Sequence, residues 1–230
     1  MKHLIGIDSK LCDIVMTEPS VITVLDRFGI ALGVGDKTIA AICAEHGLDR
    51  DFFATIINTY LNEDYFPDRI LASMDAQLII SYLQRTNAYY EQFQLPNIER
   101  HFHLLLGKSD PSNNNLGLMM RFFGEMKAQL LARIADDRSR WFPEVIELQR
   151  HAEQATDATI DKGFDEDSVE DKIDDLIHMF VMHLKGDYDH NLCLAVIISL
   201  FNLKKDITQN NRIRNRILRP LAAALKSQQP

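Results

Sequence analysis

The stretch MKAQLLARIADDRSRWFP, residues 126–143, continues a helical pattern of apolar residues. Apolar residues lead into it at alternating steps of three and four: Leu116, Met119, Phe123, Met126 and Leu130. This spacing places the side chains on one face of an α-helix, so we expect that face to be buried. The next two positions on the face are Arg133 and Asp137, two opposite charges four residues apart. The pattern therefore predicts a helix that directs an ion pair toward the protein interior.

Composition places the chain among ordinary soluble globular proteins, with 46% hydrophobic residues in 230. Its 25 Lys and Arg against 33 Asp and Glu give a net charge of −8, which argues against bulk attraction to nucleic acid or anionic membranes. Cys12, Cys43 and Cys193 lack the paired spacing of a disulfide framework or zinc site. The charged start resembles no signal peptide, and no apolar run is long enough for a membrane span. We expect a cytoplasmic protein.

Helical periodicity runs through nearly the whole chain. Residues 1–66 contain short amphipathic segments, DKTIAAICAEHG, which Gly47 closes, and LDRDFFATIINTYL. Four long helices follow. The first is expected at about 70–93, with a companion piece that ends at Gly107, the second at 116–142, the third ending near Gly186 and the fourth at 191–219. Pro96 and Pro143 are expected to end helices. The predicted fold class is all-α, with a small N-terminal helical domain, 1–66, and a four-helix bundle, 67–230.

The second and fourth long helices interrupt their apolar faces at matching positions. In the fourth helix, Val196, Leu200, Leu203 and Ile207 lead to Asn210 and Arg214. Asn210 lies ten residues before Pro220, just as Arg133 lies ten residues before Pro143. This parallel placement indicates a duplicated helical hairpin with one shared polar layer.

Five segments together resemble a known family in their order and spacing: EPSVITVLDRFGI, KTIAAICAEHGLD, YYEQFQLPNIE, RWFPEVIEL and DITQNNRIRNRILRP. The family is that of the hemerythrin-like di-iron proteins that repair iron–sulfur clusters under nitrosative or oxidative stress, called RIC proteins. The resemblance covers nearly the whole chain. It implies an N-terminal helical domain with a Cys-Cys-Gly-Gly motif, followed by a four-helix bundle that holds two irons through five His and two Glu.

The residues on which that chemistry depends are replaced. The Cys-Cys-Gly-Gly motif reads GVGD, so Gly33 and Val34 stand at the cysteine positions. Among the bundle's expected metal-ligand positions, His is replaced at Ala88, Ser109, Arg133 and Asn210, and Glu at Asp137 and Arg214. The third-helix His corresponds to Glu170, with Asp171 as the alternative.

These replacements argue against a di-iron centre, because a guanidinium group cannot ligate a cation. We expect Arg133, Asp137, Glu170 and Arg214 to form a buried ion-pair layer in place of the metal. No cofactor and no enzymatic activity are expected, and Cys43 should be a buried, inert thiol. The resulting prediction is a non-enzymatic, metal-free relative of RIC proteins with a regulatory or protein-interaction role.

Two alternative functions stay open at this point. One is iron–sulfur repair or oxygen and NO sensing with a remodelled metal site, although neither His101 with His103 nor His178 with His183 has the i, i+4 spacing of a shared metal. The other is a transcription regulator that uses the N-terminal helices. Residues 1–66 carry five Lys or Arg against ten Asp or Glu, a net charge of −5, which argues against DNA binding.

The last helix is basic, with seven Lys or Arg against one Asp in residues 204–226. Arg212, Arg216 and Arg219 can share one face of it. This face is interpreted as a solvated surface partly balanced by the acidic segment 155–175, or alternatively as a docking surface for an acidic protein partner. The identity of a partner cannot be read from the sequence, and a homodimer is left open.

Overall fold

The computed structural model describes residues 4–67, 74–110, 114–151 and 168–226. The fold is all-α, as predicted. By the contacts among its residues the chain divides into a first unit, Met1–Arg85, Val145–Phe164 and Gln209–Pro230, and a second unit, Thr86–Glu144 and Asp165–Thr208. The predicted domain boundary at residue 66 stays a prediction. In the described part of the chain no helix is both long and apolar enough to cross a membrane.

Four short helices begin the first unit: α1 (Leu11–Thr17), α2 (Val21–Arg27), α3 (Ile39–His46) and α4 (Arg50–Leu61). Thr38 caps α3 by accepting a hydrogen bond from the Ala41 N–H at 3.2 Å, and Asp49 caps α4 by accepting one from the Phe52 N–H at 2.7 Å. Gly47 ends α3 in the left-handed conformation, with φ of 63°. The two helices expected around Gly47 are therefore confirmed.

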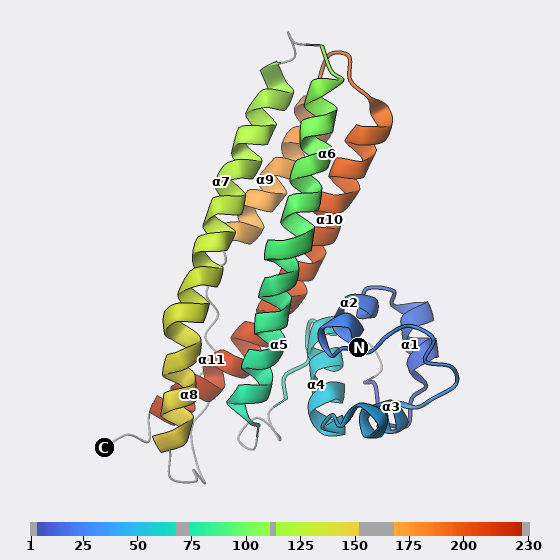
Figure 1. The fold of residues 1–230 in the computed structure, drawn as a ribbon, viewed down its shortest axis with the longest axis vertical. Coiled ribbons are helices and arrows are strands. Elements are labelled where there is room, and N and C mark those ends of the chain that lie inside the picture. Colours follow the sequence, from blue (N-terminus) through green and yellow to red (C-terminus); the bar gives the residue numbers. More distant parts are fainter. Residues whose placement is uncertain (1–3, 68–73, 111–113, 152–167, 227–230) are drawn as a thin grey trace. The chain divides into compact units, whose positions relative to one another are not determined.

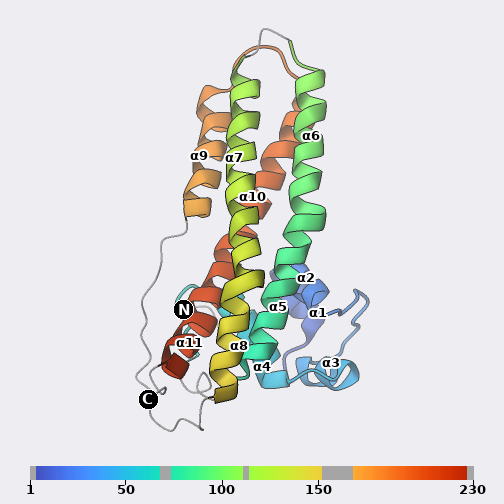
Figure 2. The same ribbon diagram turned by 60° about the vertical axis from the view of Figure 1, so that its left-hand side comes forward.

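The second unit contains four helical segments around one hydrophobic core: α6 (Leu95–Gly107), α7 (Asn114–Asp136), α9 (Ser168–His183) and the first part of α10 (His190–Ile213). They run side by side in both views (Figures 1 and 2). The predicted apolar faces form this core, because all nine of their members are at most 1% exposed: Leu116, Met119, Phe123, Met126, Leu130, Val196, Leu200, Leu203 and Ile207.

The prediction that prolines end the long helices was wrong. Helix α5 (Ala76–Tyr89) continues through a π-helical segment, η2 (Tyr90–Gln94), into α6, past Pro96. Helix α7 continues through η3 (Asp137–Trp141) into α8 (Phe142–His151), and α10 through η4 (Arg214–Leu218) into α11 (Arg219–Lys226).

The π-helical segments explain how the helices tolerate proline. A proline within an α-helix lacks an N–H and clashes with the carbonyl four residues earlier. Here the residue before each proline donates its N–H five residues back: Leu95 to Tyr90, Phe142 to Asp137 and Arg219 to Arg214. This wider turn moves the carbonyl away from the proline ring, so the helix continues.

The three π-helical segments extend the internal repeat that the sequence indicated. Each begins six residues before a proline, at Tyr90, Asp137 and Arg214. Asp137 and Arg214 therefore have a third counterpart, Tyr90. Thr86, ten residues before Pro96 and 2% exposed, is likewise the counterpart of Arg133 and Asn210.

Candidate functional site

Three of the predicted polar-layer residues belong to the second unit. Asp137 is only 1% exposed, at the point where α7 passes into η3, and Arg133 is half-buried one turn earlier. Ile134, fully buried, takes the place in the apolar row that the pattern gave to Arg133. On α9 the half-buried Glu170 accepts a hydrogen bond from the Thr208 hydroxyl of α10. The second unit thus buries the acidic side chain of Asp137, and Glu170 forms a hydrogen bond that joins α9 to α10.

Asn210, at another expected ligand position, lies in the first unit and is 4% exposed. Its side-chain oxygen accepts hydrogen bonds from the Tyr82 hydroxyl at 3.1 Å and from Nη1 of Arg27 at 3.3 Å. The same Nη1 donates to the Tyr82 hydroxyl at 3.3 Å, and the guanidinium carbon lies 5.9 Å from the centre of the Tyr82 ring. A cation of the protein itself therefore contacts the side chain that stands where the resemblance expects a metal ligand.

Arg27 and Tyr82 are functional candidates that the sequence reasoning missed. Arg27 ends α2 and is 2% exposed, although arginine is rarely buried unless it is paired. The Arg85 side chain donates a 2.8 Å hydrogen bond to the Arg27 carbonyl, and Phe28 packs on Tyr82 with ring centres 5.3 Å apart. The only sequence signal was one cation at the end of the mostly apolar segment VITVLDR, directly after Asp26.

The predicted ion-pair layer joins residues of both units and stays a prediction. Two of the other replaced positions hold side chains with local roles. Ala88 is half-buried, and the Ser109 hydroxyl, just beyond the end of α6, donates a 2.7 Å hydrogen bond to the Leu105 carbonyl in the last turn of that helix. At the replaced cysteine positions, Gly33 has φ of 95°, a conformation that side chains other than glycine rarely adopt, and Val34 is half-buried.

The basic face predicted as a partner surface makes contacts within the first unit. Arg212 donates a 3.5 Å hydrogen bond to the carbonyl of Tyr60, in the last turn of α4. Arg216 donates to the carbonyls of Glu63 and, at 3.1 Å, of Tyr65. Burial and the neighbouring Arg212 charge lower the pKa of Arg216. Arg212 and Arg216 thus satisfy carbonyls at and beyond the end of α4, and the role of this face, with Arg219, in partner binding stays a prediction.

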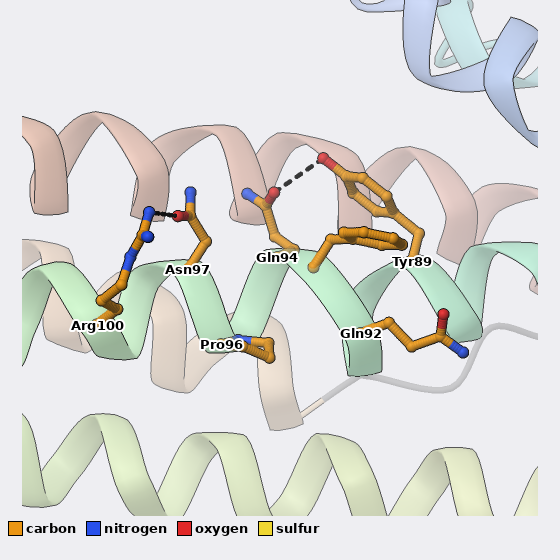
Figure 3. Close-up of a pocket in the computed structure, with 7 residues that line it drawn as sticks. Tyr89, Gln92, Gln94, Pro96, Asn97 and Arg100 are labelled. Carbon is orange, nitrogen blue, oxygen red and sulfur yellow. Dashed lines mark hydrogen bonds between the residues drawn. The ribbon is translucent and has the colours of Figure 1, made fainter.

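A surface pocket of the second unit lies over η2 and the start of α6 (Figure 3). Its volume is about 420 Å³, and its lining consists of Tyr89, Gln92, Phe93, Gln94, Pro96, Asn97 and Arg100. The Tyr89 hydroxyl donates a 2.9 Å hydrogen bond to Gln94, and Arg100 donates a 2.8 Å hydrogen bond to Asn97 (Figure 3). The Tyr89 and Phe93 rings stack with centres 6.3 Å apart.

The lining of this pocket is aromatic, polar and basic. It offers two aromatic rings, three carboxamides and one guanidinium, and it contains no His, Asp, Glu, Cys, Ser or Lys. Phe93 is 63% exposed, which leaves an apolar ring available to a ligand. The side chains of this pocket can stack on a ligand ring, form hydrogen bonds with a ligand and attract a negatively charged group.

Comparisons with known proteins leave the family unassigned. No protein-family model matches the sequence, and no curated protein is significantly similar to it. Among the described residues, His, Cys, Asp and Glu nowhere form a group of three that could hold a metal ion. The acidic segment predicted to balance the basic helix lies, in its part 155–167, outside the described residues.

Cys43 is the cysteine nearest in sequence to the replaced cysteine positions. Its thiol is expected to be unreactive in the native protein. It is 1% exposed on α3, and burial raises the pKa of its thiol to about 11. At pH 8 only about one molecule in a thousand would carry the nucleophilic thiolate. A thiol reagent should therefore label the half-buried Cys12 first, as mass spectrometry of digested protein would show. Labelling of Cys43 as fast as Cys12 would contradict this assignment.

Proposed function

We propose that this chain is a non-enzymatic protein, metal-free at the expected ligand positions of its bundle, that acts in the cytoplasm by binding a partner protein. The pocket over η2 carries the proposal, because its lining offers recognition groups without a catalytic set. A relationship to RIC proteins, and with it a role in stress, rests on the sequence motifs.

The chemistry of the pocket indicates which partner segment it takes. Its volume of about 420 Å³ is within the range of small-molecule sites, enough for one large side chain and its neighbours. The exposed ring of Phe93 favours an apolar or aromatic side chain, and Arg100 favours a carboxylate beside it. We therefore propose that the pocket binds a short segment of a partner protein. This segment carries a large apolar side chain with an acidic residue beside it.

The contacts of the replaced ligand positions support the metal-free part of the proposal. Asn210 accepts hydrogen bonds from Arg27 and Tyr82, and a cation beside it would be repelled by the Arg27 guanidinium. Arg133 and Arg214 carry guanidinium groups, which offer no lone pair to a metal ion. A di-iron centre requires imidazole and carboxylate ligands that these positions do not supply.

Photo-crosslinking from the pocket tests the binding role. A benzoylphenylalanine at Phe93, in cells that normally make the protein, is expected to give a discrete adduct with one partner. Arg100→Gln in the same chain should reduce this adduct by about tenfold, because it removes a charge-assisted contact. Arg121→Gln, at an exposed arginine of α7 in the same unit, should leave it unchanged.

A second crosslinker position outside the pocket serves as the control. Phe201 on α10 is 50% exposed, similar to Phe93, but does not line the pocket. Adducts that form equally from both positions, or an adduct at Phe93 that is insensitive to Arg100→Gln, would contradict the proposal.

A further inference from the structure

The sequence HMFVMH, residues 178–183, concentrates soft metal donors at the end of α9. His178 and Met182 are four residues apart, as are Met179 and His183, so each pair lies on neighbouring turns of one helix face. His178 and His183 are exposed, Met182 is 59% exposed, and Met179 is half-buried. Along the sequence, two methionines thus lie between two exposed histidines.

The structure brings the two imidazoles together although they are five residues apart in sequence. Their ring centres are 6.1 Å apart, with the rings nearly perpendicular at 89°. Imidazoles that bind one ion through nitrogen at about 2.0–2.1 Å can have centres at most about 6.4 Å apart, and about 5.2 Å apart at a tetrahedral angle. The observed separation lies between these two values, within reach of one shared ion.

The surroundings hold this end of α9 in place and favour a cation. Asn115 of α7 donates a 2.9 Å hydrogen bond to the His183 carbonyl, which fixes the last residue of the helix. One turn before His178 lie Asp174, which pairs with Lys204, and Asp175, which is exposed. Their spacing of five argued against a shared metal, yet the structure places the two rings in mutual contact.

From this geometry we propose that His178, Met179, Met182 and His183, the His/Met cluster, bind one soft monovalent metal ion of the Cu(I) and Ag(I) class. Thioether sulfur selects such ions over zinc, iron or magnesium. This site is separate from the expected ligand positions of the bundle and goes beyond the proposed function.

Silver titration tests the site without redox chemistry. Thiols also bind Ag(I), so the titration uses full-length Cys12→Ser/Cys193→Ser protein in chloride-free buffer, with Cys43 left buried. One Ag(I) per chain is expected, with the imidazole NMR signals of His178 and His183 shifting together. His178→Gln/His183→Gln and Met179→Leu/Met182→Leu should each weaken binding by about 10- to 100-fold.

Matched controls separate this site from general binding by His or Met. His101→Gln/His103→Gln on α6 and Met16→Leu on α1, where Met16 is 82% exposed, should leave the affinity unchanged. Circular dichroism would confirm that every variant stays folded. No silver binding by the parent protein, an affinity unaffected by the cluster variants, or zinc bound as tightly as silver would each overturn the proposal.

Discussion

Asp137→Ala is expected to lower the free energy of unfolding by about 3–5 kcal/mol. The carboxylate is 1% exposed, and Arg133 lies one turn earlier on the same helix. Removing the acid of the predicted Arg133–Asp137 pair would leave the neighbouring cation without compensating charge, which costs more than an ion pair itself contributes. Urea unfolding at pH 7, followed by circular dichroism, would measure the loss.

Two further variants identify the cause of that loss. Asp175→Ala, at an exposed position within α9, should change the stability by less than about 0.5 kcal/mol. Arg133→Met/Asp137→Leu should recover most of the stability, since apolar residues of similar volume can replace a buried pair at little cost. A loss below about 1 kcal/mol for Asp137→Ala, or a double variant as unstable as the sum of the singles, would show that the two charges do not form a buried pair.

The second large effect is expected for Arg27→Ala, about 3–5 kcal/mol of lost stability. The change opens a cavity at a position that is 2% exposed and removes the hydrogen bonds that Arg27 donates to Tyr82 and Asn210. Chemical unfolding monitored by circular dichroism would measure it, with Arg121→Ala on the exposed face of α7 as the neutral control.

Arg27→Met separates the two contributions, because methionine restores much of the side-chain volume without the hydrogen bonds. It should recover roughly half of the lost stability, the part that is due to the cavity. If Arg27→Ala were no more harmful than Arg121→Ala, Arg27 would not anchor Asn210, and the account of the first unit would be wrong.

The sequence predicted the parts of this fold that depend on local periodicity. The apolar rows of α7 and α10 were identified residue by residue, because a helical repeat of 3.6 marks buried positions directly. The prolines led to a wrong prediction of the helix ends. Proline usually ends an α-helix, but a π-helical turn before it lets the helix continue, and the sequence pattern did not indicate that turn. Pro96, Pro143 and Pro220 each follow such a turn.

The contacts of the candidate site were harder to predict, because they join residues far apart in the chain. Arg27 and Asn210 are separated by 183 positions, and no pattern in either helix indicates the other. Arg212 and Arg216 were recognised as basic but not as donors to carbonyls around the end of α4, which only the folded chain brings near. The pocket lies over η2, a π-helical segment that the sequence did not predict.

Polar contacts of the protein itself are proposed to replace the metal at the expected ligand positions. Anaerobic titration of tag-free protein with Fe(II), read as iron retained per chain after desalting and as the change in Tm, tests this most directly. A metal that binds the native state raises Tm in proportion to the logarithm of its excess over Kd. We expect well under one iron per chain, likewise for manganese and zinc, and an unchanged Tm. Two retained irons per chain with a raised Tm would contradict the account.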